Sequence, residues 1–347
     1  MFVLMKHDVI NDLWKILPEK SFHAVICDPP YSLESITKRF GNGQAGAKFA
    51  KDVSFQRLSK GFMGQTWDND VAFRPETWYN IMQIMLPGAI GMAFSSTRTF
   101  HRLATAIENA GFIIHSSIAW IQSQGFPKGK NVYKELLKRG DQDAKSFYGY
   151  SYGIASLSPS FEPICVFQKP FKGSQLSVAR EYGTGLYNIK DARFGSRKVT
   201  INSFTNGAKP FGNAVGEDYE TKISEGMFPK NVIFDQAPEE INDYFLSIDN
   251  YVYHKKAVGK KDKHFGLKYK NPHPTVKPIG LITYLAKLLL PPDLFYPRRV
   301  LVPFCGSGSE MIGCLFAGWD EVYGFDNHDE YLDVAKERLE YAEKVCV

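Results

Sequence analysis

An aspartate, two prolines and a tyrosine stand together near the start of the sequence and have the chemistry to bind an amine. They follow an apolar run, residues 24–27, that predicts a buried strand. Pro29 and Pro30 end this strand because neither has an N–H to give to a sheet. In open α/β sheets, ligands bind just beyond such strand ends. Asp28 and the carbonyl of Pro29 can accept two N–H bonds from a planar amine, and Tyr31 can stack on its ring. An ordinary turn capped by Asp28 is the alternative.

A glycine-rich bend near the other end of the chain is the second feature. Residues 299–302 predict a strand and residues 310–318 a helix, so the glycines between them let a ligand approach backbone N–H groups. The next predicted strand, residues 321–325, ends in Asp326, 20 residues after Gly306. That is close to the spacing at which a carboxylate binds a ribose in dinucleotide folds. The bend lacks the full G-x-G-x-x-G pattern, which disfavours a nicotinamide cofactor.

Predicted helices and strands alternate along most of the chain, which favours an α/β fold with a mostly parallel, doubly wound sheet. Further strands are expected at residues 1–5, 89–94, 112–121 and 161–167, and helices at 9–17, 74–85, 100–109, 279–290 and 331–341. Asp8 follows the first strand, where it could contact a ligand or cap the next helix.

Composition excludes several classes of protein. The 347 residues are 44% hydrophobic, with no run of about 18 apolar residues, so we expect no membrane span. The N-terminus does not read as a signal peptide. Five cysteines without C-x-x-C spacing argue against a zinc site and a disulfide framework, and for the cytoplasm. No metal is expected.

The net charge of +5 lies in the middle of the chain. Residues 169–271 hold 17 lysines and arginines against 12 acidic residues, and the rest of the chain is balanced. Aromatic residues alternate with these basic ones, as suits phosphate contacts and base stacking, although a charge run is usually only a solvated surface. A basic, glycine-containing loop also follows Tyr31. The candidate nucleic-acid contacts are Lys38, Arg39, Lys255, Lys256, Lys260, Lys261 and Lys263.

The order of these motifs resembles the amino-methyltransferases of DNA of the circularly permuted (beta) class, which use S-adenosylmethionine. In that family a D-P-P-Y comes first, a target-recognition region follows, and F-x-G-x-G comes last. Connecting segments are also similar, at residues 62–64, 67–68, 161–164, 228–232 and 273–278. The resemblance implies a Rossmann-like class I methyltransferase fold. Residues 1–169 would be its catalytic half, 170–271 an inserted recognition region, and 272–347 its cofactor-binding half.

The resemblance also implies roles for individual residues. Asp28, Pro29, Pro30 and Tyr31 would hold the target base. Asp8 would contact the cofactor's adenine amine and Asp326 its ribose, while the glycine motif would cradle the methionine part. The complete set of implied cofactor contacts is Asp8, Asp28, Thr275, Lys277, Phe304, Cys305, Gly306, Ser307, Gly308, Asp326 and Asn327.

The expected activity is methyl transfer to the exocyclic amine of a flipped-out base in double-stranded DNA. Adenine N6 is preferred because the cytosine N4 enzymes of the family more often carry Ser in place of Asp28; cytosine N4 is the alternative. One departure matters: the family usually has an acid where this chain has Val302, so a catalytically weakened DNA-binding homologue is a second alternative. The lysine-rich middle argues against a small-molecule methyltransferase. A homodimer and a restriction endonuclease partner stay open.

Overall fold

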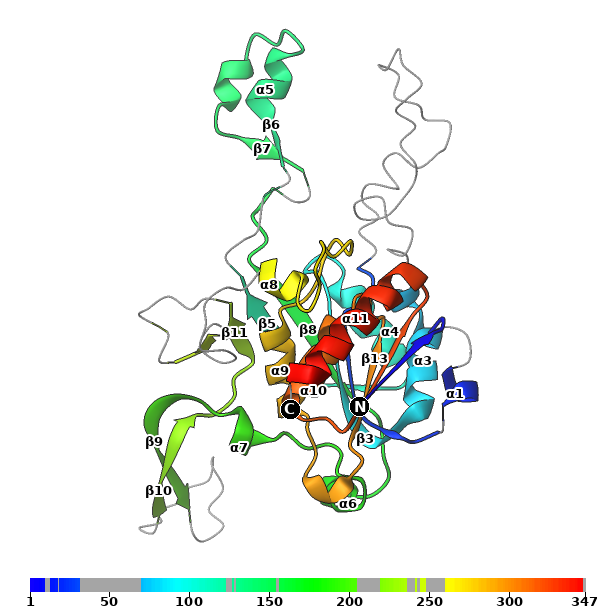
Figure 1. Cartoon of the computed structure of the whole chain (residues 1–347). Coiled ribbons are helices and arrows are strands. Elements are labelled where there is room, and N and C mark those ends of the chain that lie inside the picture. The colour runs from blue at the N-terminus through cyan, green and yellow to red at the C-terminus, as the bar shows by residue number, and fades with distance from the viewer. Residues whose placement is uncertain are drawn as a thin grey trace.

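The structure is a computed structural model (Figure 1). It describes residues 1–9, 13–17, 19–31, 70–122, 127, 129–153, 156–204, 219–235, 241, 244–247 and 260–345. None of the helices in these ranges is long and apolar enough to cross a membrane. The cysteines at 27, 165, 305 and 314 are buried free thiols.

One large sheet forms the centre of the molecule, as the alternation of elements predicts. Its order is β1 (Phe2–Lys6), β14 (Glu321–Asp326), β13 (Arg299–Pro303), β2 (Phe22–Cys27), β3 (Met85–Phe94), β8 (Phe161–Gln168), β5 (Ile118–Ile121), β11 (Val232–Phe234) and β12 (Leu246–Ser247). A short strand, β4 (Ile113–Ile114), also pairs with β8. Neighbouring strands are parallel except at β8, which is antiparallel to β3, β4 and β5. The mostly parallel α/β fold is therefore confirmed.

Helices cover both faces of the sheet. On one face lie α1 (Leu13–Ile16), α3 (Pro75–Ile84) and α4 (Phe100–Asn109), and on the other α9 (Ile279–Leu288), α10 (Ser309–Ala317) and α11 (Asp329–Val345). The strand sequences fit this arrangement because successive side chains point to opposite faces. In β2, Ala24 and Ile26 pack under α9 and α10, whereas Val25 and Cys27 pack under α3 and α4. All four side chains are fully buried.

The most important pairing joins two strands that are far apart in the sequence. β13 lies parallel to β2, with Val300 opposite Ala24 and Leu301 opposite Val25. Because parallel neighbours end at the same edge of a sheet, the residues that follow β2 and the glycine bend that follows β13 meet there. The sheet thus brings together the two motifs that the sequence places near opposite ends of the chain.

The single strand predicted over residues 112–121 is wrong. The structure has β4 and β5 there, because the backbone breaks at residues 115–117 while both halves still pair with β8. The helix predicted over residues 9–17 is described only as α1, since residues 10–12 lie outside the described part. Short 3-10 helices are also found: η2 (Val71–Phe73) buries Val71 and Ala72, whereas η6 (Asp293–Phe295) has no buried residue.

Between β5 and β8 the chain leaves the sheet, which the sequence does not predict. This excursion contains β6 (Lys130–Asn131), α5 (Val132–Leu137), η3 (Ala144–Phe147) and β7 (Ser151–Tyr152), and stands away from the sheet in Figure 1. No residue of α5 is buried. The excursion is therefore held mainly by its own short-range contacts.

Several described elements within residues 170–271 pack against the main sheet or belong to it. In this range α6 (Gln175–Tyr182) and α7 (Ile189–Ala192) contact β3 and α9, while β11 and β12 belong to the main sheet. By contrast, β9 (Phe194–Phe204) and β10 (Tyr219–Met227) form a separate antiparallel pair. α8 (Lys260–Lys263) is joined to α9 and α11, because Asp262 accepts a hydrogen bond from the backbone of Ile279 and its carbonyl accepts one from Arg338.

Candidate active site

A cavity of about 1090 Å³ opens at the strand ends where the two motifs meet. Most residues implied as site residues line it: Asp8, Asp28, Pro29, Pro30, Tyr31, Lys263, Thr275, Lys277, Phe304, Cys305, Gly306, Ser307, Asp326 and Asn327. Gly308, Lys260 and Lys261 are not among the lining residues. Lys38, Arg39, Lys255 and Lys256, together with the motif residues 62–64 and 67–68, lie outside the described residues. The cavity therefore joins the amine-binding motif to the glycine bend.

Asp28 is the first residue beyond β2 and is largely buried. Its Oδ2 accepts a hydrogen bond of 2.6 Å from Lys277 Nζ. Its Oδ1 is also buried but has no hydrogen-bond partner among the described residues. A buried carboxylate oxygen is rarely left without a donor. Asp28 thus lines the cavity and keeps one acceptor without a donor.

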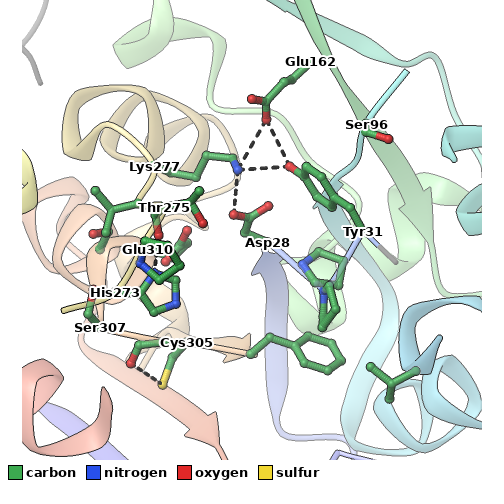
Figure 2. Close-up of a pocket in the computed structure, with 18 of the residues that line it drawn as sticks. Asp28, Tyr31, Ser96, Glu162, His273, Thr275, Lys277, Cys305, Ser307 and Glu310 are labelled. Atoms are coloured by element: carbon green, nitrogen blue, oxygen red, sulfur yellow. Dashed lines mark hydrogen bonds and ion pairs between the residues drawn. The ribbon is translucent and has the colours of Figure 1, made fainter. Parts of the chain in front are cut away.

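Lys277 holds a cluster of three side chains at this wall (Figure 2). Besides Asp28, its Nζ donates to Tyr31 Oη at 3.0 Å and lies 3.3 Å from Glu162 Oε2. Tyr31 Oη in turn donates to Glu162 Oε2 at 3.0 Å. Burial alone would lower the pKa of Lys277, but the carboxylates of Asp28 and Glu162 outweigh burial and hold it above its ordinary value. The ammonium therefore stays charged and fixes both Asp28 and Tyr31.

The glycine bend, residues 303–308, connects β13 to α10. A positive φ is found at Phe304 (61°), Gly306 (48°) and Gly308 (82°). A Cβ atom at Gly306 would lie 3.0 Å from His273 Nε2, whereas one at Gly308 would lie 3.1 Å from Ala335 Cβ. The two glycines therefore have different roles. Gly306 leaves the backbone beside the cavity free of a side chain, and Gly308 lets α10 pack closely against α11.

Asp326 fixes the bend to the end of the neighbouring strand β14. Its Oδ2 accepts a hydrogen bond of 2.9 Å from the backbone N–H of Gly306, and its Oδ1 accepts one of 3.0 Å from the N–H of His328. The carboxylate lines the cavity, and the exposed Asn327 lies next to it. A carboxylate oxygen accepts more than one hydrogen bond, so Asp326 keeps acceptor capacity for a ligand.

Two polar residues that the sequence analysis did not select support the bend from behind. Asn271 Nδ2 donates to Ser307 Oγ at 3.0 Å, and Arg338 Nη1 donates to Ser307 O at 2.5 Å and to Ser309 Oγ at 3.0 Å. Arg338 is fully buried. Its position on α11 is close to the chain end and carries no motif, so only the fold reveals this support.

His273 closes the cavity from the segment that precedes α9. Its backbone N–H donates to Asn271 Oδ1 at 2.9 Å, and its Nδ1 is hydrogen-bonded to the carbonyl of Thr275. Burial lowers the pKa of His273 to about 4. The imidazole is therefore neutral near pH 7 and adds no charge to the cavity.

Glu310 is a further carboxylate that the sequence analysis did not select. It lies in the first turn of α10, lines the cavity and is only 5% exposed. Burial and the neighbouring charge of Asp28 raise its pKa to about 7, while Lys277 acts in the opposite direction. The sequence signal that could have identified Glu310 is an acidic residue two positions after the glycine bend.

Comparisons with known proteins agree with this geometry. A family model for N6/N4 methyltransferases, described as DNA methylase, matches residues 22–337. The Type II methyltransferase M.HindIII of Haemophilus influenzae is 29% identical over 181 residues, which are 47% of this chain and 57% of that protein. The chain thus spans little more than half the length of this curated relative.

Two solved structures are also similar to this chain. PvuII DNA methyltransferase (cytosine-N4-specific) has a TM-score of 0.50 at 12% identity, covering 99% of this chain and 92% of that one. The M1.HpyAVI complex with SAM has a TM-score of 0.44 at 16% identity, covering 98% and 99%. Because the family model spans nearly the whole sheet, including both motifs at the cavity, the chain belongs to the DNA methylase family.

Proposed function

We propose that this protein transfers a methyl group from S-adenosylmethionine to the exocyclic amine of a base flipped out of double-stranded DNA, with adenine N6 as the preferred acceptor. The main support for the proposal is Asp28. Its Oδ1 has no hydrogen-bond donor, and the residue lines the same cavity as the glycine bend. Asp28 can accept hydrogen bonds from an amine, and the backbone of the glycine bend is accessible to a ligand.

The residues present fit the cofactor. The volume of about 1090 Å³ exceeds what a single small ligand usually needs, so there is space for a cofactor and a base together. Gly306 and Asp326 stand where backbone and ribose contacts are needed, and Asp8 lines the same cavity. When bound, S-adenosylmethionine supplies a methyl group on a sulfonium centre.

Asp28 and Pro29 would activate the amine. The lone pair of an exocyclic amine is delocalised into the ring, so the free amine is a poor nucleophile. Hydrogen bonds from the two N–H groups to Asp28 Oδ1 and the Pro29 carbonyl favour the tetrahedral nitrogen that develops during attack. The carboxylate also stabilises the positive charge where it appears. Holding the amine in line with the methyl group lowers the barrier further.

The resemblance implied that Lys277 contacts the cofactor. In the role proposed here, Lys277 instead positions Asp28. Its Nζ binds Oδ2 of Asp28 and leaves Oδ1 without a hydrogen-bond donor. Tyr31, held through its hydroxyl by Lys277 and Glu162, would present its ring for stacking on the flipped base.

The decisive experiment is to incubate the protein with methyl-labelled S-adenosylmethionine and unmodified duplex DNA, and to identify the labelled nucleoside by mass spectrometry. We expect N6-methyladenine. Labelled N4-methylcytosine would keep the reaction but reverse the choice of base. Cofactor binding without any label in DNA, over a range of DNA sequences, would contradict the proposal.

A further inference from the structure

Glu310 is a buried carboxylate that forms no ion pair with a cation among the described residues. The hydrogen bond that favours its ionised form comes from its own backbone N–H. It stands in the first turn of α10, where a negative charge is favourable, but it is 95% removed from solvent and faces the cavity. A solvated position would satisfy the helix end equally well, so the burial of this carboxylate calls for another explanation.

Carboxylates predominate on the part of the cavity wall around Glu310. Glu310, Asp28 and Glu162 all line the cavity, and among the described residues Lys277 is the cation that contacts the last two. Arg338 approaches from α11, but its guanidinium is used by carbonyl and hydroxyl oxygens behind the glycine bend. The other titratable neighbours bring no positive charge, because burial keeps the thiols neutral and the imidazole neutral: Cys27, Cys305, Cys314 and His273.

Val302 gives a reason for a carboxylate at this place. It stands where the resembling family usually has an acid, and here it is a fully buried core residue of β13 that does not line the cavity. The carboxylate nearest the glycine bend on the α10 side is therefore supplied by Glu310, eight residues later in the chain. In this chain an acidic residue therefore follows the glycine bend, whereas in the resembling family it usually precedes the bend.

We propose that the carboxylate of Glu310 binds the ammonium group at the amino-acid end of the cofactor, in place of the acid that Val302 replaces. This inference rests on the proposed function. Glu310 lines the same cavity as Asp28, which would face the target amine, and it follows the bend, which would hold the methionine part. A primary ammonium is the group of the cofactor that pairs best with a buried carboxylate.

Calorimetric binding of S-adenosylhomocysteine tests the proposal without relying on activity. At pH 8 we expect Glu310→Gln to bind it about ten- to a hundredfold more weakly than the wild type, as for the loss of one charge-assisted hydrogen bond. Binding of 5′-methylthioadenosine, which lacks the ammonium, should be equal in both. The exposed Glu330→Gln removes the same charge from α11 outside the cavity and should leave both affinities unchanged.

The pH dependence separates a direct contact from a structural role. In the wild type, ammonium binding requires Glu310 to be ionised, so affinity for S-adenosylhomocysteine should fall as the pH drops from 8 to 6. In Glu310→Gln this fall should disappear. Equal affinities and equal pH profiles in the two proteins would overturn the assignment while leaving the cofactor in place. No binding of either ligand by the wild type would overturn the proposed function itself. Thermal melting of the ligand-free variant checks that it is folded.

Discussion

Lys277 Nζ lies 2.6 Å from Asp28 Oδ2, although 249 residues of chain separate the two side chains. The contact is possible because β2 and β13 are parallel neighbours and because the segment before α9 crosses their ends. It fixes one oxygen of the carboxylate and leaves the other unused. The orientation of Asp28 is therefore set before any substrate arrives.

Replacing Lys277 should damage both stability and catalysis. In Lys277→Met, two buried carboxylates, Asp28 and Glu162, lose their shared cation, so we expect a loss of about 3–5 kcal/mol in the free energy of unfolding. Asp28 also loses the hydrogen bond that fixes its orientation, so the methylation rate should fall. Urea unfolding and the methylation rate measure the two effects. The exposed Lys336→Met is the control, and a variant as stable and active as this control would contradict the role of Lys277.

Removing the carboxylate of Asp28 should separate chemistry from DNA binding. In Asp28→Ala the amine loses one of its two acceptors, so methyl transfer should fall by at least about 10²-fold. DNA affinity, measured by fluorescence anisotropy, should remain near the wild-type value, because phosphate contacts supply most of it. Asp329→Asn, an exposed position paired with Lys6, controls for the change in charge. Methyl transfer at the wild-type rate would remove Asp28 from the mechanism.

The two glycines of the bend should respond differently to a methyl group. Both have a positive φ, so Gly306→Ala and Gly308→Ala should each reduce stability by about 1 kcal/mol or more. Only at Gly306 does the new Cβ enter the side of the bend that faces His273 and the cavity. We expect calorimetry to show weaker cofactor binding for Gly306→Ala than for Gly308→Ala. The reverse order would mean that the cofactor contacts the bend elsewhere.

Glu310 should make the ligand-free protein less stable as the pH rises. Its pKa is about 7 in the folded protein against 4.5 for an ordinary glutamate, so the folded state binds the extra proton between these values. The contribution of this proton to the free energy of unfolding is then complete below about pH 4.5. It is lost as the pH rises to 7, which lowers the free energy of unfolding by up to about 3 kcal/mol. The difference in urea stability between the wild type and Glu310→Gln should change by this amount between pH 5 and 8. A constant difference would show that burial does not affect Glu310 in this way.

The sequence predicted much of the fold because strand ends and helix starts carry local signals. The helix over residues 100–109 is found as α4 with the same bounds, and residues 299–302 lie within β13. The direction of β8 was not predictable, since an apolar run reads the same in parallel and antiparallel pairing. The excursion around α5 was missed because its elements are short and no residue of α5 is buried.

The sequence could place a residue at the strand ends where that residue follows a strand directly, but it could not show contacts with distant partners. Asp28 and Gly306 line one cavity because each follows a buried strand. By contrast, the contact between Lys277 and Asp28, and the support of Ser307 by Arg338, depend on how whole elements pack. Glu310 lies next to the glycine bend, but its burial is a property of the folded core that no local spacing shows.

The pairing of β2 with β13 also has a consequence for biosynthesis. A ribosome that has made the first 300 residues has produced the turn at Asp28 but neither the bend nor the arginine behind it. The cavity can therefore assemble only after α11 has been made. A polypeptide truncated before the bend would lack one side of the site that we propose.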